Sequence, residues 1–112
     1  MNYFTQKNAN GTLNISSFVF IQSAKKALDD LLEDELKDVV FLKSGKKTCK
    51  ITCDIDKKNK IVLTAEVFIA SDKNANEATA KIQKEIFDAI YDATEISNVK
   101  VNVIVLGFVI KK

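Results

Sequence analysis

The chain has 112 residues, a formal net charge of +2 and 46% hydrophobic residues, which is enough for one domain with its own core. Histidine, tryptophan and proline are absent, and all 17 basic residues are lysine. The composition therefore excludes chemistry that depends on histidine as a base or metal ligand, and it excludes the bidentate arginine clamp of many phosphate sites.

The sequence predicts neither a membrane helix nor an export signal. The longest uninterrupted apolar stretch runs from Val103 to Ile110, well short of the roughly 18 residues that a membrane helix needs. Residues 1–7 lack both the basic start and the apolar stretch of a signal peptide. We therefore expect a cytoplasmic protein.

The N-terminal residues predict an arm followed by a strand. Residues 1–10 are polar and show no period, so we expect a flexible arm ahead of a single domain over residues 11–112. Gly11 to Ile15 alternates like a short strand. Ser16 or Ser17 can then cap a helix by accepting from its free N–H groups.

The first helix is predicted from about Phe18 to Leu36. Its core-facing stripe comprises Ile21, Ala24, Ala27, Leu28, Leu31 and Leu32. An acidic cluster lies toward its C-terminal half: Asp29, Asp30, Glu33, Asp34 and Glu35. Negative charge is unfavourable at that end of a helix. The cluster is either a solvated face or a docking surface for a basic partner.

The middle of the chain has the pattern of a β-hairpin. Residues 39–42 form a short apolar piece and residues 43–47 a turn, after which residues 48–56 and 61–70 alternate apolar and polar side chains. The predicted inward residues are Cys49, Ile51, Cys53, Ile55, Ile61, Leu63, Ala65, Val67 and Ile69. A Lys57-Lys58-Asn59 loop keeps them on one face and puts Asn59 in the left-handed conformation. This register sets two pairs opposite each other, Lys50 with Glu66 and Thr52 with Thr64.

The last third predicts a helix and a long strand. The helix spans Glu77 to Ala93, with Asn74 as its cap, and the strand runs from Val99 to Phe108. Every long element has one apolar face. The simplest arrangement is an α+β two-layer sandwich in the order β-α-(β)-β-β-α-β, with both helices packed on one face of a small mixed sheet.

Two cysteines, Cys49 and Cys53, lie on the same face of one predicted strand. Four residues of strand separate their Cα atoms by about 13 Å, whereas a disulfide needs about 7 Å or less. They are expected to be structural thiols in a reducing compartment, with redox or modification roles as the alternative.

The outer face of the sheet is not uniformly polar. The residues that fall on it by parity are Val62, Phe68, Ile104 and Leu106. They form either a surface for self-association or a protein partner, or a patch that the N-terminal arm or a connector covers. Phe87 and Tyr91 make an i,i+4 pair off the main stripe of the second helix, either at the edge of the core or as a binding anchor.

Lysines concentrate around the predicted hairpin: Lys43, Lys46, Lys47, Lys50, Lys57, Lys58 and Lys60. A solvated hairpin explains them. The alternative is weak, salt-sensitive contact with RNA or anionic lipid. Specific nucleic-acid binding is not expected, because the outer face of the long strands offers only Phe68 for base stacking and the chain has no arginine.

No catalytic, cofactor or metal constellation emerges. The serines and threonines have no histidine to activate them, and two cysteines alone make a poor zinc set. We expect a protein that is not an enzyme and carries no cofactor.

Four stretches of the chain resemble the alkaline shock protein family of low-GC Gram-positive bacteria and their relatives. Residues 11–16 resemble its opening G-x-I-x-I-S, and residues 75–93 its second helix. Val39 falls where the family has a short Gly-Val, with Asp38 in place of the glycine. Residues 101–108 are close to its V-N-V-x-V-x-G-hydrophobic ending. At two turns the chain departs from the family, with Glu95 at a usual glycine and Ser71-Asp72 at a usual Tyr-Gly.

The resemblance implies a non-catalytic role. Members of the family are associated with alkaline and cell-envelope stress and with envelope homeostasis, and some are tied to the membrane through a partner. The family has no agreed catalytic residues, so none is carried over. We therefore expect a protein of envelope or stress homeostasis that acts through protein contacts. The runner-up is a weak RNA-binding or regulatory module that uses the lysine-rich hairpin.

Overall fold

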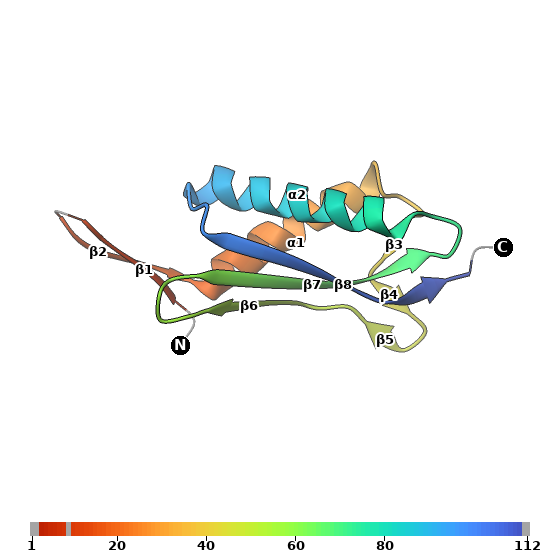
Figure 1. Ribbon diagram of the computed structural model, residues 1–112, viewed down its shortest axis with the longest axis horizontal. Coiled ribbons are helices and arrows are strands. Elements are labelled where there is room, and N and C mark those ends of the chain that lie inside the picture. The colour runs from red at the N-terminus through yellow and green to blue at the C-terminus, as the bar shows by residue number, and fades with distance from the viewer. Residues whose placement is uncertain (1–2, 9, 111–112) are drawn as a thin grey trace.

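Strand β7 (Ile61–Ala70) organises the fold because it pairs with three other strands. Along one edge it runs parallel to β8 (Val99–Val109). Along the other edge it is antiparallel first to β6 (Ile51–Ile55) and then to the short β3 (Val40–Phe41). The computed structural model describes residues 3–8 and 10–110, and Figure 1 shows these strands as one layer.

Two helices cover a single face of this sheet (Figure 1). Helix α1 (Ser17–Glu33) packs against β6, helix α2 (Ala75–Thr94) packs against β8, and the helices pack on each other. Parallel strands need a crossover connection, which α2 provides between β7 and β8. The predicted α+β sandwich with both helices on one face is confirmed.

The core lies between the helices and the inward face of the sheet. Alternate β7 residues are completely buried: Ile61, Leu63, Ala65, Val67 and Ile69. Helix α2 adds Ala78, Ile82, Ile86 and Ile90, and α1 adds Phe20, Ala24, Leu28 and Leu31. The predicted α1 stripe omitted Phe20, which is 0% exposed. The buried stripe is rotated toward Phe20, so that Ile21, Ala27 and Leu32 lie at its margins and are only partly buried.

Local capping signals in the sequence are confirmed. The Ser16 Oγ accepts from the Phe18 N–H at 3.2 Å, and the Asn74 Oδ1 accepts from the N–H groups of Asn76 and Glu77. Asn59 has a φ of 62°, in the left-handed region. Thr52 pairs with Thr64 as expected. Helix α1 ends at Glu33, three residues before its predicted end.

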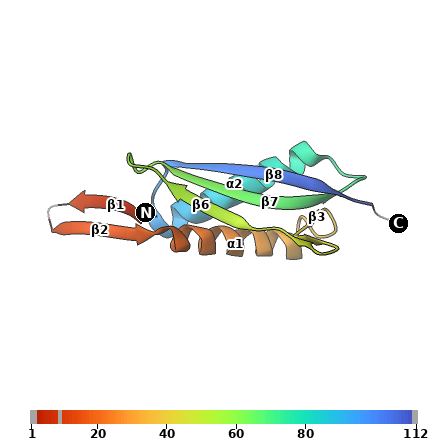
Figure 2. The ribbon, with the colours of Figure 1, turned by 90° about the horizontal axis from the view of Figure 1, so that it is seen from below.

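A flexible N-terminal arm was predicted over residues 1–10, but residues 3–8 have regular structure. They form β1 (Tyr3–Asn8), which pairs antiparallel with β2 (Gly11–Ser16) in a two-stranded ribbon. Figure 2 shows the ribbon extending away from the helices and the main sheet. Phe4 anchors it by packing edge-on against Phe20, with ring centroids 6.4 Å apart, and Ile15 also packs against the core. Residues 1–2 and 9 lie outside the described residues.

The strand predicted over residues 48–56 is shorter than expected. The chain leaves the main sheet before β6 and forms a small hairpin of β4 (Lys43–Ser44) and β5 (Lys47–Thr48). The Cys49 N–H continues this pairing by donating to the Leu42 carbonyl at 2.8 Å. Cys49 is therefore half-buried, at the end of the small hairpin rather than within the core, whereas Cys53 is buried as predicted.

Candidate interaction site

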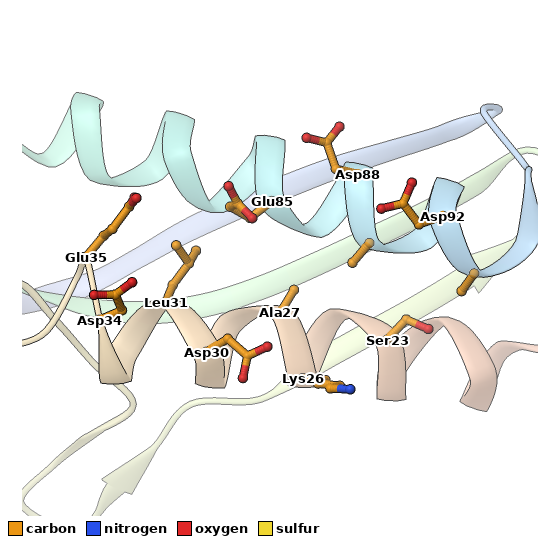
Figure 3. Close-up of a pocket in the computed structure, with 12 residues that line it drawn as sticks. Ser23, Lys26, Ala27, Asp30, Leu31, Asp34, Glu35, Glu85, Asp88 and Asp92 are labelled. Atoms are coloured by element: carbon orange, nitrogen blue, oxygen red, sulfur yellow. The ribbon is translucent and has the colours of Figure 1, made fainter.

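A groove of about 490 Å³ lies between the two helices and opens on the side away from the sheet (Figure 3). Its floor consists of small and apolar side chains from both helices: Ala27, Leu31, Ala89 and Ala93. Six carboxylates surround that floor: Asp30, Asp34 and Glu35 from the α1 side, and Glu85, Asp88 and Asp92 from α2. We call this feature the acidic helix groove.

The acidic helix groove carries a net negative charge. Glu35 forms a salt bridge with Lys81, and the Asp88 carboxylate lies 4.0 Å from the Lys84 ammonium. Four carboxylates have no ion pair among the described residues: Asp30, Asp34, Glu85 and Asp92. Lys26 is the only basic side chain that lines the groove within the described part of the chain. Such a site attracts cationic groups, and the alanine floor leaves room for a close approach.

The sequence predicted half of this groove. It singled out the α1 cluster, of which Asp30, Asp34 and Glu35 line the groove, while Asp29 and Glu33 do not. It missed the carboxylates of α2. Their spacing was a usable signal, because positions 85, 88 and 92 follow an i, i+3, i+7 pattern and therefore lie on one helix face.

The predicted outer-face surface is smaller than expected. Ile104 is 46% exposed, whereas Val62 and Leu106 are half-buried. Phe68 is only 6% exposed, so it does not belong to an open surface. Of the two interpretations, cover by neighbouring parts of the chain holds for Phe68, whereas Ile104 is exposed and its role in contacts stays a prediction.

Phe68 is buried by local packing on the outer face. A Cβ atom added at Gly107 would lie 3.5 Å from the Phe68 ring, so the ring packs on the bare glycine backbone of β8. Phe68 also faces Phe41 of β3 in the antiparallel register, and β4 contacts this strand as well. The glycine and the connector before β6 together remove Phe68 from solvent.

The lysines of the predicted basic patch divide into two groups. Lys43, Lys46 and Lys47 lie on the small β4–β5 hairpin, and Lys57, Lys58 and Lys60 lie in the β6–β7 turn. Figure 1 shows the two groups at opposite ends of β6. All six are exposed, as is Lys50 near the start of β6. The prediction of one continuous basic patch is therefore wrong, because the extended β6 separates lysines that are close in sequence.

The two cysteines are free thiols in different surroundings. Burial raises the pKa of the Cys53 thiol to about 11, and the neighbouring Asp54 carboxylate acts in the same direction. Burial also raises the pKa of the Cys49 thiol, with a smaller effect from Glu66. A raised pKa keeps a thiol protonated and unreactive near neutral pH. Cys53 therefore behaves as a core residue.

The described residues were also compared with the requirements of a metal site and of a membrane-spanning helix. Within residues 3–8 and 10–110, no three His, Cys, Asp or Glu side chains are arranged to hold a metal ion. Over the same residues, neither helix is long and apolar enough to cross a membrane. A comparison with models of known protein families and with curated proteins finds no match for this chain.

Proposed function

We propose that this protein is a non-enzymatic member of the alkaline shock protein family that acts in cell-envelope or stress homeostasis through protein–protein contacts. The observation that carries the proposal is the acidic helix groove, in which carboxylates from two helices surround an apolar floor. The groove fits a basic segment of a partner protein, whose lysine or arginine side chains pair with the carboxylates while its apolar atoms contact the alanines.

The state of the carboxylates supports binding rather than catalysis. Five of the six are exposed and Glu85 is half-buried, so water solvates them. General acid–base catalysis usually takes place in a cleft that excludes water from the reacting groups. Solvated carboxylates on a groove provide charge complementarity, which gives a binding site specificity and a fast association rate.

Two backbone positions support the family resemblance. Asp38 has a φ of 63° and Glu95 a φ of 60°, both in the left-handed region. At these two positions the alkaline shock family carries glycine, the residue that adopts this conformation without strain. The chain thus keeps the backbone geometry that the family's glycines favour, although its own side chains differ.

The RNA-binding alternative has less support. Single-stranded nucleic acid is usually held by a continuous basic groove with aromatic side chains on which bases stack. Here the lysines lie in two separate groups, and Phe68 is buried. The lysine-rich hairpin region therefore lacks the combination of the two features that the alternative requires.

Charge reversal in the native cell tests the proposal. The double variant Asp30→Lys with Asp92→Lys reverses one carboxylate on each side of the groove. A matched control, Asp29→Lys with Glu33→Lys, makes the same change in charge on α1 outside the groove. In a strain that lacks the protein, the wild type and the control should restore growth under alkaline and envelope stress, and the groove variant should not.

Affinity purification from the same strains identifies what binds. A protein partner recovered with the wild type and the control, and lost from the groove variant, supports the proposal. Equal recovery with all three proteins would show that the groove is not the contact site. A deletion strain that tolerates both stresses as well as the wild type would contradict the role in envelope homeostasis.

A further inference from the structure

Strand β8 is an unprotected edge of the main sheet. It is 11 residues long, and among the described strands it pairs only with β7. Residues 101–110 contain neither a charged residue nor a proline. Natural proteins usually protect a long edge strand with lysine, proline or a covering element, because its free N–H and C=O groups are a template for another strand. Apart from Lys100 near its start, β8 lacks the first two protections.

The free backbone groups of this edge can be assigned from the ladder. The Ile61 N–H donates to the Asn98 carbonyl, and in a parallel pair alternate residues direct their polar groups to the same neighbour. Asn98 and every second residue after it therefore direct their backbone groups to β7. The N–H and C=O groups of the residues between them point to the open edge; these are Val99, Val101, Val103 and Val105. One of these carbonyls, that of Val101, accepts a hydrogen bond from the Gln83 side chain at 3.3 Å. That single side-chain hydrogen bond satisfies one carbonyl group, whereas a neighbouring strand would pair with the whole edge.

The β8 edge has an exposed phenylalanine at one end and a groove at the other, both on the same face. A register shift after Val105 pairs Phe108 with the inward-facing Ile69, which puts Phe108 on the helix-covered face, where it is 59% exposed. At the other end, a groove of about 300 Å³ lies on the same face between α2 and β8. Its lining residues are Gln83, Lys84, Phe87, Val99 and Val101.

We propose that a second copy of this chain pairs antiparallel along β8, about a two-fold axis at Ile104. In this register Val103 exchanges hydrogen bonds with Val105 of the second copy, since both direct their polar groups to the edge. The register shift then sets Phe108 of each copy opposite Val101 of the other, at the groove that Phe87 lines. The two sheets become one continuous sheet.

Self-pairing explains features that an unrelated strand would leave unused. A two-fold axis repeats every contact, so one exposed phenylalanine and one groove on the same chain become two filled grooves. Ile104 lies at the midpoint of β8, is 46% exposed, and meets its own copy across the axis. Neither contact places two charged side chains opposite each other, and the lysine that lines the groove, Lys84, has a side chain that is 76% exposed.

The first test is the mass of the protein in solution, measured by sedimentation equilibrium. The wild type should have twice the 12.5 kDa mass of the chain. Ile104→Lys sets two like charges directly opposite each other across the axis, so the mass should fall to that of one chain. Phe18→Lys is the matched control, because Phe18 is 60% exposed and lies on α1, away from β8. It should leave the mass doubled.

A crosslinking test keeps the proposal falsifiable if Ile104→Lys does not fold. Residues opposite each other at a non-hydrogen-bonded position have Cα atoms about 4.5 Å apart, within the range of a disulfide. Ile104→Cys should therefore form a covalent dimer under mild oxidation, whereas Lys100→Cys should not. A wild-type protein that is a single chain at every concentration overturns the proposal. So does a dimer that survives Ile104→Lys and is not crosslinked through position 104.

Discussion

The β1–β2 ribbon and the helix-covered sheet each contain an alternating strand, β2 and β7, but they are stabilised very differently. In the sheet, the inward side chains of β7 are 0% exposed because two helices cover them. In the ribbon, Tyr3 and Leu13 are each 48% exposed. A two-stranded ribbon alone is marginal in water, since it buries little apolar surface. The comparison shows that alternation stabilises a strand only where another layer covers its apolar face.

The ribbon is held to the sheet by few interactions. The Asn59 side chain binds the backbone of Thr5 twice, accepting from its N–H at 3.2 Å and donating to its carbonyl at 2.7 Å. Phe4 packs against Phe20, and Ile15 is half-buried at the base. The β2 residues from Gly11 to Asn14 are exposed. We therefore expect the ribbon to open locally at a much lower free energy than the sheet.

The strongest test compares one charge placed in each region. Val67→Asp buries an unpaired carboxylate beneath the helices and should cost more than about 4 kcal/mol, which unfolds a domain of ordinary stability. Leu13→Asp places the same group on the ribbon and should change the free energy of unfolding by less than about 0.5 kcal/mol. Circular dichroism and urea denaturation measure both. A folded Val67→Asp protein would show that the β7 register is wrong.

A second test uses the buried thiol of the sheet. Because the folded protein raises the pKa of Cys53 from 9.0 to about 11, it binds that proton more tightly than the unfolded chain does. The Cys53 contribution to stability is therefore complete below pH 9 and is lost as the pH rises toward 11, on the order of 2 kcal/mol.

The control for the thiol is Cys53→Ala, measured by urea denaturation across the same pH range. The free energy of unfolding of the wild type should fall more steeply above pH 9 than that of the variant. Parallel curves would indicate that water reaches the Cys53 thiol. Thiol labelling of the folded wild type should also be slow and should accelerate on unfolding.

The attachment of the ribbon can be weakened without disturbing the turn that holds it. Asn59→Gly keeps the left-handed backbone conformation but removes both side-chain hydrogen bonds to Thr5, at a local cost of about 1–2 kcal/mol. Hydrogen exchange of the β1 amides should accelerate, and exchange of the β7 amides should not. Asn98→Ala is the control, since it removes a bond to the Asn59 carbonyl and leaves Thr5 untouched.

The smallest expected effect is a gain in stability confined to the sheet and helices. Glu95 ends α2 with a φ of 60°, so Glu95→Gly should relieve about 1 kcal/mol of backbone strain. Glu95→Ala retains the Cβ atom and should give no such gain. The denaturation midpoint of Glu95→Gly should rise while exchange from the ribbon stays unchanged. A lower midpoint would show that the Glu95 side chain stabilises this turn in another way.

Much of the sheet and of both helices was predictable because their signals are local. The alternation of residues 61–70 determined which side chains face the core, and Asn59 and Asn74 marked a turn and a helix start. The outer-face surface and the basic patch were predicted less well. Phe68 is covered by Gly107, a residue 39 positions away, and β6 separates the two lysine groups in space. Neither arrangement can be read from the alternation or the spacing of residues along the chain.

The sequence by itself determined the class of fold, since periodic apolar faces of these lengths have one simple way to be buried. It also determined that no histidine or arginine chemistry takes place. Only the tertiary structure decided that residues 3–8 form a strand, that carboxylates of α1 and α2 surround one groove, and that β8 is an open edge. These features depend on contacts between residues that are far apart in the chain. The packing of helices and strands, rather than local propensity, determines which of those residues meet.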